Sequence, residues 1–162
     1  MVMNSWKADG TVNLPWMHEA VKREVIAAIR LRYQLMPYLW QLFERAHAQH
    51  QPIIRPTFYN FPNDENCYAD CDDFMLGDAL LVAPVVHAGD LTRRVYLPQG
   101  PRAWFDFYSG EPLAAGQWHT VAAPLSMLPL FAPAGAAVPV AERTQGIARH
   151  DDPITATRRF NN

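Results

Sequence analysis

The pattern of apolar residues changes once along this 162-residue sequence, and that change limits the folds the chain can adopt. Over residues 16–49 the apolar residues recur at steps of three and four, which predicts an amphipathic helical region. Pro37 falls inside this region. Because a proline within a helix removes a backbone hydrogen bond and clashes with the preceding turn, we expect two helices, arranged as a hairpin, or one kinked helix.

Residues 52–61, PIIRPTFYNF, follow the helical region and predict a single strand between two prolines. Ile53, Ile54, Phe58 and Tyr59 do not alternate with polar residues, so we expect this strand to be buried on both faces. Such strands are typical of parallel sheets covered by helices. The segment therefore indicates the last α/β unit of a larger sheet or barrel.

Beyond an acidic loop, the sequence consists of short apolar runs separated by turns rich in glycine and proline. The runs are residues 74–86, 93–97, 103–108, 117–122 and 127–131. Regular short strands of this kind predict an antiparallel sandwich. A last run from Ile154 to Phe160 predicts the start of another strand, for which the sequence offers no obvious partner.

One pair of helices and one doubly buried strand do not make a domain, because their apolar faces need further strands and helices to cover them. Left bare, they would form an apolar patch and an open strand edge, which promote association. The sequence therefore predicts a piece of a larger architecture, with self-association or poor solubility when it is alone.

Composition excludes several classes of function. The net charge is −2 and there is no run of Lys or Arg, which argues against a nucleic-acid or membrane surface. The uncharged stretch over residues 122–140 is broken by four prolines and a glycine and cannot form a membrane helix. The first ten residues do not resemble a signal peptide. Cys67 and Cys71 could form a disulfide only if their loop turned back sharply, and they lack further ligands at zinc spacing. Two free thiols are the preferred interpretation, which favours a reducing compartment and a cytoplasmic location.

Several ordered motifs resemble glycoside hydrolase family 31, the α-glucosidase and α-xylosidase type. Residues 31–64 contain R-Y-x-L-x-P-Y-L, then R-P and F-P-x-D, and residues 72–86 contain F-M-L-G-D followed by L-L-V-A-P-V. Further on, Y-L-P-x-G, W-x-D and A-P-L follow in the family's order. The resemblance extends from residue 4 to about residue 142.

The resemblance implies an α+β fragment: a helical hairpin and the last strand of a TIM barrel, followed by an antiparallel β-sandwich. Residues 1–61 would end the (β/α)8 barrel, 62–78 would connect, 79–143 would form the proximal C-terminal sandwich, and 144–162 would start a further strand or be a disordered tail. In that family two Asp residues on barrel strands upstream act as nucleophile and general acid/base. Neither of the motifs that carry them is found here, so we expect no catalytic residue in this chain.

Three residues are predicted to lie near the substrate. Arg55 lies in the expected last strand, and TIM-barrel sites collect at the C-terminal ends of strands. The simpler interpretation is a buried cation paired with a carboxylate from elsewhere in the barrel. Asn4 and Trp6 precede the helices, in what the resemblance makes the loop after the seventh strand, with Trp16 further on. Many family members have a His where this sequence has Asn4.

Two other pairs of residues suggest sites but are explained more simply. His47 and His50 lie three apart at a helix end, where cations are favourable without a metal. Asp72 and Asp73 are adjacent, and we expect a solvated loop there. We therefore expect no metal and no cofactor.

Three functions remain open at this stage. The first is a part of a retaining α-glycosidase that acts on terminal α-linked sugars, with no activity of its own. The second is a carbohydrate-binding β-sandwich module without catalytic activity, using aromatic side chains. Those side chains are Trp104, Phe105, Phe107, Tyr108 and Trp118. The third is a structural role in which the chain assembles through its bare helix and strand.

Overall fold

The computed structural model of the chain describes residues 5–6, 8–14, 17–141 and 156–161. The helical elements are η2 (Glu19–Val21), α1 (Lys22–Gln34), α2 (Met36–Gln49), α3 (Thr57–Asn60) and η3 (Glu65–Tyr68). The strands are β1 (Ser5–Trp6), β2 (Val12–Asn13), β3 (Ile54–Pro56), β4 (Phe74–Leu76), β5 (Leu80–Val82), β6 (Thr92–Leu97), β7 (Trp104–Asp106), β8 (Pro112–Leu113), β9 (Gln117–Ala122), β10 (Leu130–Pro133), β11 (Ala137–Val140) and β12 (Ala156–Arg159). No described helix is long and apolar enough to cross a membrane.

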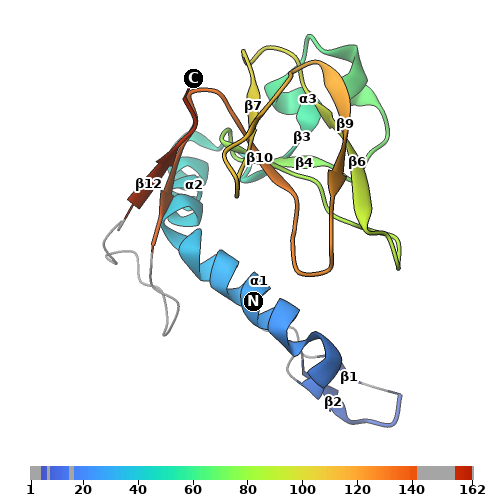
Figure 1. Ribbon diagram of the computed structural model, residues 1–162. Helices are drawn as coiled ribbons and strands as arrows, with labels where there is room; N and C mark the ends of the chain where they lie inside the picture. The colour runs from blue at the N-terminus through green and yellow to red at the C-terminus, as the bar shows by residue number, and fades with distance from the viewer. Residues whose placement is uncertain (1–4, 7, 15–16, 142–155, 162) are drawn as a thin grey trace.

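The predicted break in the helical region is confirmed, but the hairpin is wrong. Leu35 alone separates α1 from α2, and Pro37 lies in the first turn of α2, where its missing N–H leaves no bond unmade. Figure 1 shows the two helices running end to end along a bent line, with α1 leading away from the sheet. A one-residue break with φ −84° and ψ 0° is too short to reverse the chain, because helical hairpins need two to five connecting residues.

The main sheet has six strands in the order β3-β4-β5-β10-β7-β8, and all its neighbours are antiparallel. Strands β6 and β9 form a separate antiparallel ribbon, as do β11 with β12 and β1 with β2. The predicted antiparallel β region is therefore confirmed. Strand β4 lies within residues 62–78, so that segment contains a strand and is not only a connection.

Both faces of the six-stranded sheet are covered, and its strands alternate between them. Leu80 and Val82 join one apolar cluster, with Tyr38 and Leu42 of α2. Leu81 joins a second cluster, which contains apolar residues of β6. The helix and the β11–β12 pair therefore cover one face, and the β6–β9 ribbon covers the other (Figure 1).

The strand expected over residues 52–61 is different from the prediction. Only Ile54–Pro56 is strand, it pairs antiparallel with β4, and Thr57–Asn60 is a helical turn. Ile54, Phe58 and Tyr59 are 63%, 40% and 50% exposed, so burial on both faces in a parallel sheet is wrong for this chain. Pro56 explains why the strand ends early. It has no N–H to donate to a sheet ladder, and at φ −62° it caps the start of α3.

The end of the described chain returns to the core. Strand β12 pairs with β11, so the expectation that this last strand has no partner is wrong. Phe160 is buried and its ring lies 6.1 Å from Phe105 and 6.0 Å from Phe107. Residues 142–155 and 162 lie outside the described residues.

Candidate functional site

The polar side chains that the fold buries are the first candidates for a functional site. In the described part of the chain these are Arg55, Thr57, Asp64 and Asp73. Burying a polar or charged group is costly unless it has partners, so the contacts of each of these residues show how it is held.

Asp64, from the F-P-x-D motif, is enclosed by hydrogen-bond donors. Its carboxylate accepts from the Gln99 backbone N–H at 2.8 Å and from the Tyr96 hydroxyl at 3.0 Å. The backbone and side-chain amides of Asn66 donate to it at 3.2 and 3.3 Å. Burial raises the pKa of Asp64, but these donors outweigh it and the pKa lies below the ordinary value. This carboxylate is an ionised structural acceptor that ties two loops together.

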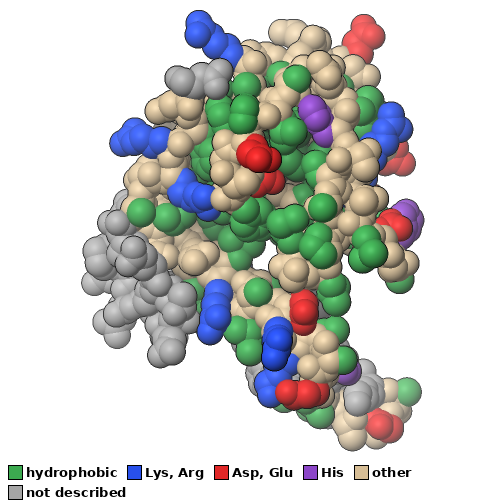
Figure 2. Space-filling view, viewed as in Figure 1, with side chains coloured by type: hydrophobic (Ala, Val, Ile, Leu, Met, Phe, Trp, Pro, Cys, Tyr) green, Lys and Arg blue, Asp and Glu red, His purple; other side chains and the backbone are tan. Residues whose placement is uncertain are grey.

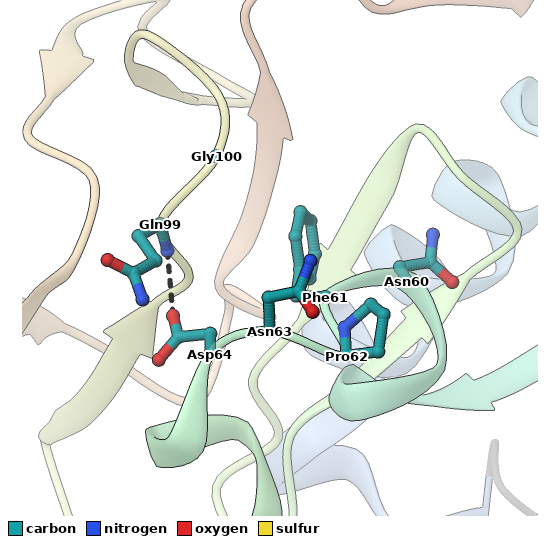
Figure 3. Close-up of a pocket in the computed structure, with 7 residues that line it drawn as sticks. All are labelled: Asn60, Phe61, Pro62, Asn63, Asp64, Gln99 and Gly100. Atoms are coloured by element: carbon teal, nitrogen blue, oxygen red, sulfur yellow. Dashed lines mark hydrogen bonds between the residues drawn. The ribbon is translucent and has the colours of Figure 1, made fainter.

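A shallow pocket of about 370 Å³ lies beside Asp64 (Figure 3). It is lined by Asn60, Phe61, Pro62, Asn63, Asp64, Gln99 and Gly100. The Asp64–Gln99 hydrogen bond closes one side of it, as the dashed line in Figure 3 marks. The only charged group in its lining is the Asp64 carboxylate, which already has its donors. The pocket has no group free to act as an acid or a base.

Asp73 was expected in a solvated loop, and that prediction is wrong. Its side chain is buried and accepts from Arg93 Nη2 at 2.7 Å. Arg93 also donates to the carbonyl oxygens of Pro84 and Arg94, so it joins β6 to the segments before β4 and after β5. Burial raises the pKa of Asp73 to about 6, against the opposing effect of Arg93. Nothing beside Asp73 in the sequence indicates this partner, which lies twenty residues further along the chain.

The turn between β4 and β5 is the point where α2 meets the sheet. The Tyr38 hydroxyl donates to the Leu76 carbonyl at 2.6 Å and accepts from the Ala79 N–H at 3.1 Å. Burial raises the pKa of Tyr38 to about 12. Gly77 has φ +63°, and an added Cβ would lie 2.4 Å from Leu42. The glycine of F-M-L-G-D is therefore required by both backbone and packing.

Other family motifs are also fixed by hydrogen bonds. Trp104 of W-x-D is fully buried, and its Nε1–H donates to the carbonyl of Pro98 in Y-L-P-x-G at 2.8 Å. Asp106 accepts from the backbone N–H groups of Tyr108 and Ser109, which closes the following turn. These residues hold the fold together.

The aromatic residues proposed for sugar binding mostly lie in the core. Trp104, Phe105 and Phe107 are buried, and the Tyr108 hydroxyl donates to the Leu128 carbonyl. Trp118 is 44% exposed, but the Arg94 guanidinium lies 4.3 Å over its ring. No flat aromatic platform for a sugar ring remains among these five side chains.

The structure places two of the segments predicted near a substrate apart from each other. Arg55 lies in β3, a strand of the main sheet, whereas β1, which contains Trp6, lies at the outer end of α1 (Figure 1). Asn4, Trp16 and the side chain of Trp6 lie outside the described residues. All three substrate-proximal assignments therefore stay predictions.

The remaining candidates carry no reactive arrangement. Cys67 and Cys71 are free thiols, as expected, and burial raises the pKa of Cys67 to about 11. His50 ends α2 at φ 55°. No three His, Cys, Asp or Glu side chains of the described residues gather as a metal site requires.

Comparison with known proteins identifies what the motifs belong to. A family model described as the glycosyl hydrolase family 31 C-terminal domain matches residues 50–138. Alpha-glucosidase 2 of Bacillus thermoamyloliquefaciens is 40% identical over 125 residues, covering 76% of this chain and 16% of the relative. The alpha-xylosidase of Saccharolobus solfataricus is 35% identical over 127 residues, covering 78% of this chain and 17% of the relative.

Solved structures agree with these sequence matches. A family 31 dextranase of Flavobacterium johnsoniae, complexed with glucose, aligns with a TM-score of 0.74 at 35% identity, covering 81% of this chain and 16% of that one. A family 31 alpha-xylosidase from a soil metagenome, complexed with xylose, gives a TM-score of 0.74 at 36% identity, covering 80% and 19%. The chain spans less than a fifth of the length of these proteins.

Proposed function

We propose that this chain, which belongs to glycosyl hydrolase family 31, is the non-catalytic C-terminal part of a longer α-glycosidase. The observation that carries the proposal is the use of its buried carboxylates. Asp64 is held by amide and hydroxyl donors, and Asp73 by Arg93. Each carboxylate is bound to structural partners, so neither is free to act as nucleophile or proton donor.

Residues 1–61 are proposed to be the end of the catalytic barrel, with α1, α2 and β3 packing against the part of the polypeptide that precedes them. The exposure of their apolar side chains supports this. No residue of α1 is buried, and Ile26, Ile29 and Phe43 stand exposed on the two helices. Figure 2 shows green apolar side chains along this arm among basic and acidic ones. A preceding barrel would cover them.

The complete protein would act on terminal α-linked sugars by the retaining mechanism. Two aspartates of the preceding part, with carboxyl groups roughly 5 Å apart, would form and then hydrolyse a covalent glycosyl-enzyme. Relatives named as alpha-glucosidases and alpha-xylosidases support α-linked substrates as a class. Asn4 and Trp6 stay proposed as substrate-proximal in that complete protein. This chain would contribute barrel closure and a rigid support.

A sugar-binding module is the weaker alternative, because the aromatic side chains it would need are in the core or covered. The two functions separate in one experiment. The 162-residue chain and the complete polypeptide encoded by its gene are assayed on p-nitrophenyl α-glucoside and α-xyloside. We expect hydrolysis by the complete polypeptide only. Hydrolysis by the 162-residue chain alone would overturn the proposal, and so would a gene that encodes nothing before residue 1.

Glucose, isomaltose and xylose are then titrated into the 162-residue chain, with tryptophan fluorescence as the readout. We expect no saturable change. Saturation that is lost in Trp118→Ala would favour the binding module, because Trp118 is the most exposed of the five aromatic candidates.

A further inference from the structure

The basic residue Arg55 is buried without a negatively charged partner among the described residues. Its Nε–H donates to the Pro52 carbonyl at 2.7 Å and its Nη2 donates to the Gln51 side-chain oxygen at 3.1 Å. The guanidinium carbon lies 5.2 Å from the centre of the Tyr59 ring. In the described part of the chain, no carboxylate lies within 4.0 Å of it. Among the described residues, the charge therefore contacts neutral groups alone.

Among the described residues, Arg55 therefore lacks both a countercharge and a full set of hydrogen-bond acceptors. A buried guanidinium without an anion is costly, which is why buried charges in proteins are paired. Nη1 makes no hydrogen bond in the described part of the chain. Within the described residues, the Nη1 side of the guanidinium therefore lacks an acceptor.

Strand β3 and the two helical turns that follow it expose large apolar or aromatic side chains. We call these the β3–α3 patch: Ile54, Phe58, Tyr59 and Tyr68, all exposed. Phe58 and Tyr68 stack with ring centres 5.1 Å apart and an interplanar angle of 9°. A cation in contact with an exposed aromatic ring is an arrangement found in packed interfaces, in which one charged pair is enclosed by apolar contacts.

We propose that the β3–α3 patch binds the preceding part of the same polypeptide, and that an Asp or Glu side chain of that part pairs with the free Nη1 edge of Arg55. The proposal rests on the proposed function, which supplies the preceding segment. Charge complementarity selects the partner residue: carboxylates match the planar guanidinium fork, and the patch itself contributes no acid.

The test compares Arg55→Met at two chain lengths, the 162-residue chain and the complete polypeptide. Hydrogen exchange of the amides of Phe74–Leu76, the strand paired with β3, is the local readout. In the 162-residue chain, the variant removes an unpaired buried charge, so exchange should be unchanged or slower. In the complete polypeptide it leaves the partner carboxylate unpaired, so exchange should be at least tenfold faster.

Two control variants separate charge from packing. Gln51→Ala removes an acceptor of Arg55 but keeps the charge, so its effect should be the same at both lengths. Arg94→Met removes a cation stacked on Trp118 in the β6–β9 ribbon and should change nothing at either length. Arg55→Lys keeps the charge without the fork and should fall between wild type and Arg55→Met in the complete polypeptide.

The failures of the two proposals are distinguishable. If wild-type α1, α2 and β3 exchange equally fast at both lengths, nothing covers them, and the proposed function fails. If they are protected in the complete polypeptide but Arg55→Met has the same effect at both lengths, the covering is real and the Arg55 pair is wrong. Protection that appears in the 162-residue chain only as its concentration rises would assign the patch to a second copy and also overturn the proposal.

Discussion

In the six-stranded sheet, β5 and β10 bury side chains on both faces, while at the other end of the molecule α1 buries none. The helix α2 stands between these regions: Tyr38 and Leu42 pack on the sheet, and Phe43 faces outward at 57% exposure. The central part of the sheet is completed within this chain, whereas the helical arm and the β3–α3 patch, which includes the edge strand β3, are left exposed. This contrast shows where the family motifs act. The motifs that are joined to each other by hydrogen bonds lie in the completed region of the sheet, where they hold loops in place.

The largest expected effect lies in the completed region, at Trp104. Trp104→Ala removes a fully buried ring together with its hydrogen bond to Pro98, and should destabilise the fold by about 3–5 kcal/mol. Urea unfolding followed by far-UV circular dichroism measures it. Trp118→Ala is the matched control and should lose less than about 1 kcal/mol. Equal losses at the two tryptophans would remove the distinction between sheet core and ribbon surface.

Gly77 tests the contact between α2 and the sheet. Gly77→Ala combines a left-handed backbone with a Cβ placed 2.4 Å from Leu42, so we expect a loss of about 2–4 kcal/mol. Gly110 also has positive φ, at +75°, but has open space around it, so Gly110→Ala should lose only about 1 kcal/mol of strain. Thermal unfolding of the two variants gives the comparison. A loss at Gly77 no larger than that at Gly110 would mean that α2 does not press on the turn.

The buried aspartates predict a pH dependence. The pKa of Asp73 is about 6 in the fold and about 4 when unfolded, so the folded state binds its proton more tightly. This contribution to stability is fully present below about pH 4 and is lost as pH rises through 6. The free energy of unfolding of Asp73→Asn, relative to that of wild type, should therefore rise between pH 4.5 and pH 7 by about 2 kcal/mol at most. Urea unfolding at these two pH values measures the rise.

Asp64 gives the opposite sign and serves as the control for Asp73. Its pKa is lowered in the fold, so its contribution is present above the unfolded pKa and is lost as pH falls through the folded one. Asp64→Asn should lose stability at pH 7, and the loss should shrink only as the pH falls below about 4. Parallel pH profiles for the two variants would contradict the different surroundings assigned to these carboxylates.

The smallest effect on stability, and the clearest on association, is expected on the helical arm. Phe43→Ser exchanges an exposed ring for a small polar side chain and should change the free energy of unfolding by less than about 0.5 kcal/mol. The wild-type 162-residue chain should self-associate through this bare surface, and the variant should do so less. Size exclusion with light scattering measures both, and a wild-type monomer at high concentration would break the comparison.

The elements that the sequence predicts well are those decided by near neighbours. The break at Pro37, the short antiparallel strands and the turns between them follow from local pattern and from proline and glycine. The candidate site was predicted less well: Arg55 was correctly expected to be buried, but its neighbours Pro52, Gln51 and Tyr59 were not identified. Asp73 was placed in solvent, since nothing beside it in the sequence indicates Arg93, twenty residues away.

The sequence by itself determined the order of helical and β regions, the family to which the motifs point, and the absence of that family's catalytic aspartate motifs. The tertiary structure decided the rest. It made α1 and α2 one bent arm, covered both faces of an antiparallel sheet, gave β12 a partner in β11, and left Arg55 without a carboxylate partner among the described residues. The physical reason is the separation along the chain over which each effect acts. Periodicity and turn residues act over a few positions, whereas burial and ion pairing depend on segments that meet only after folding.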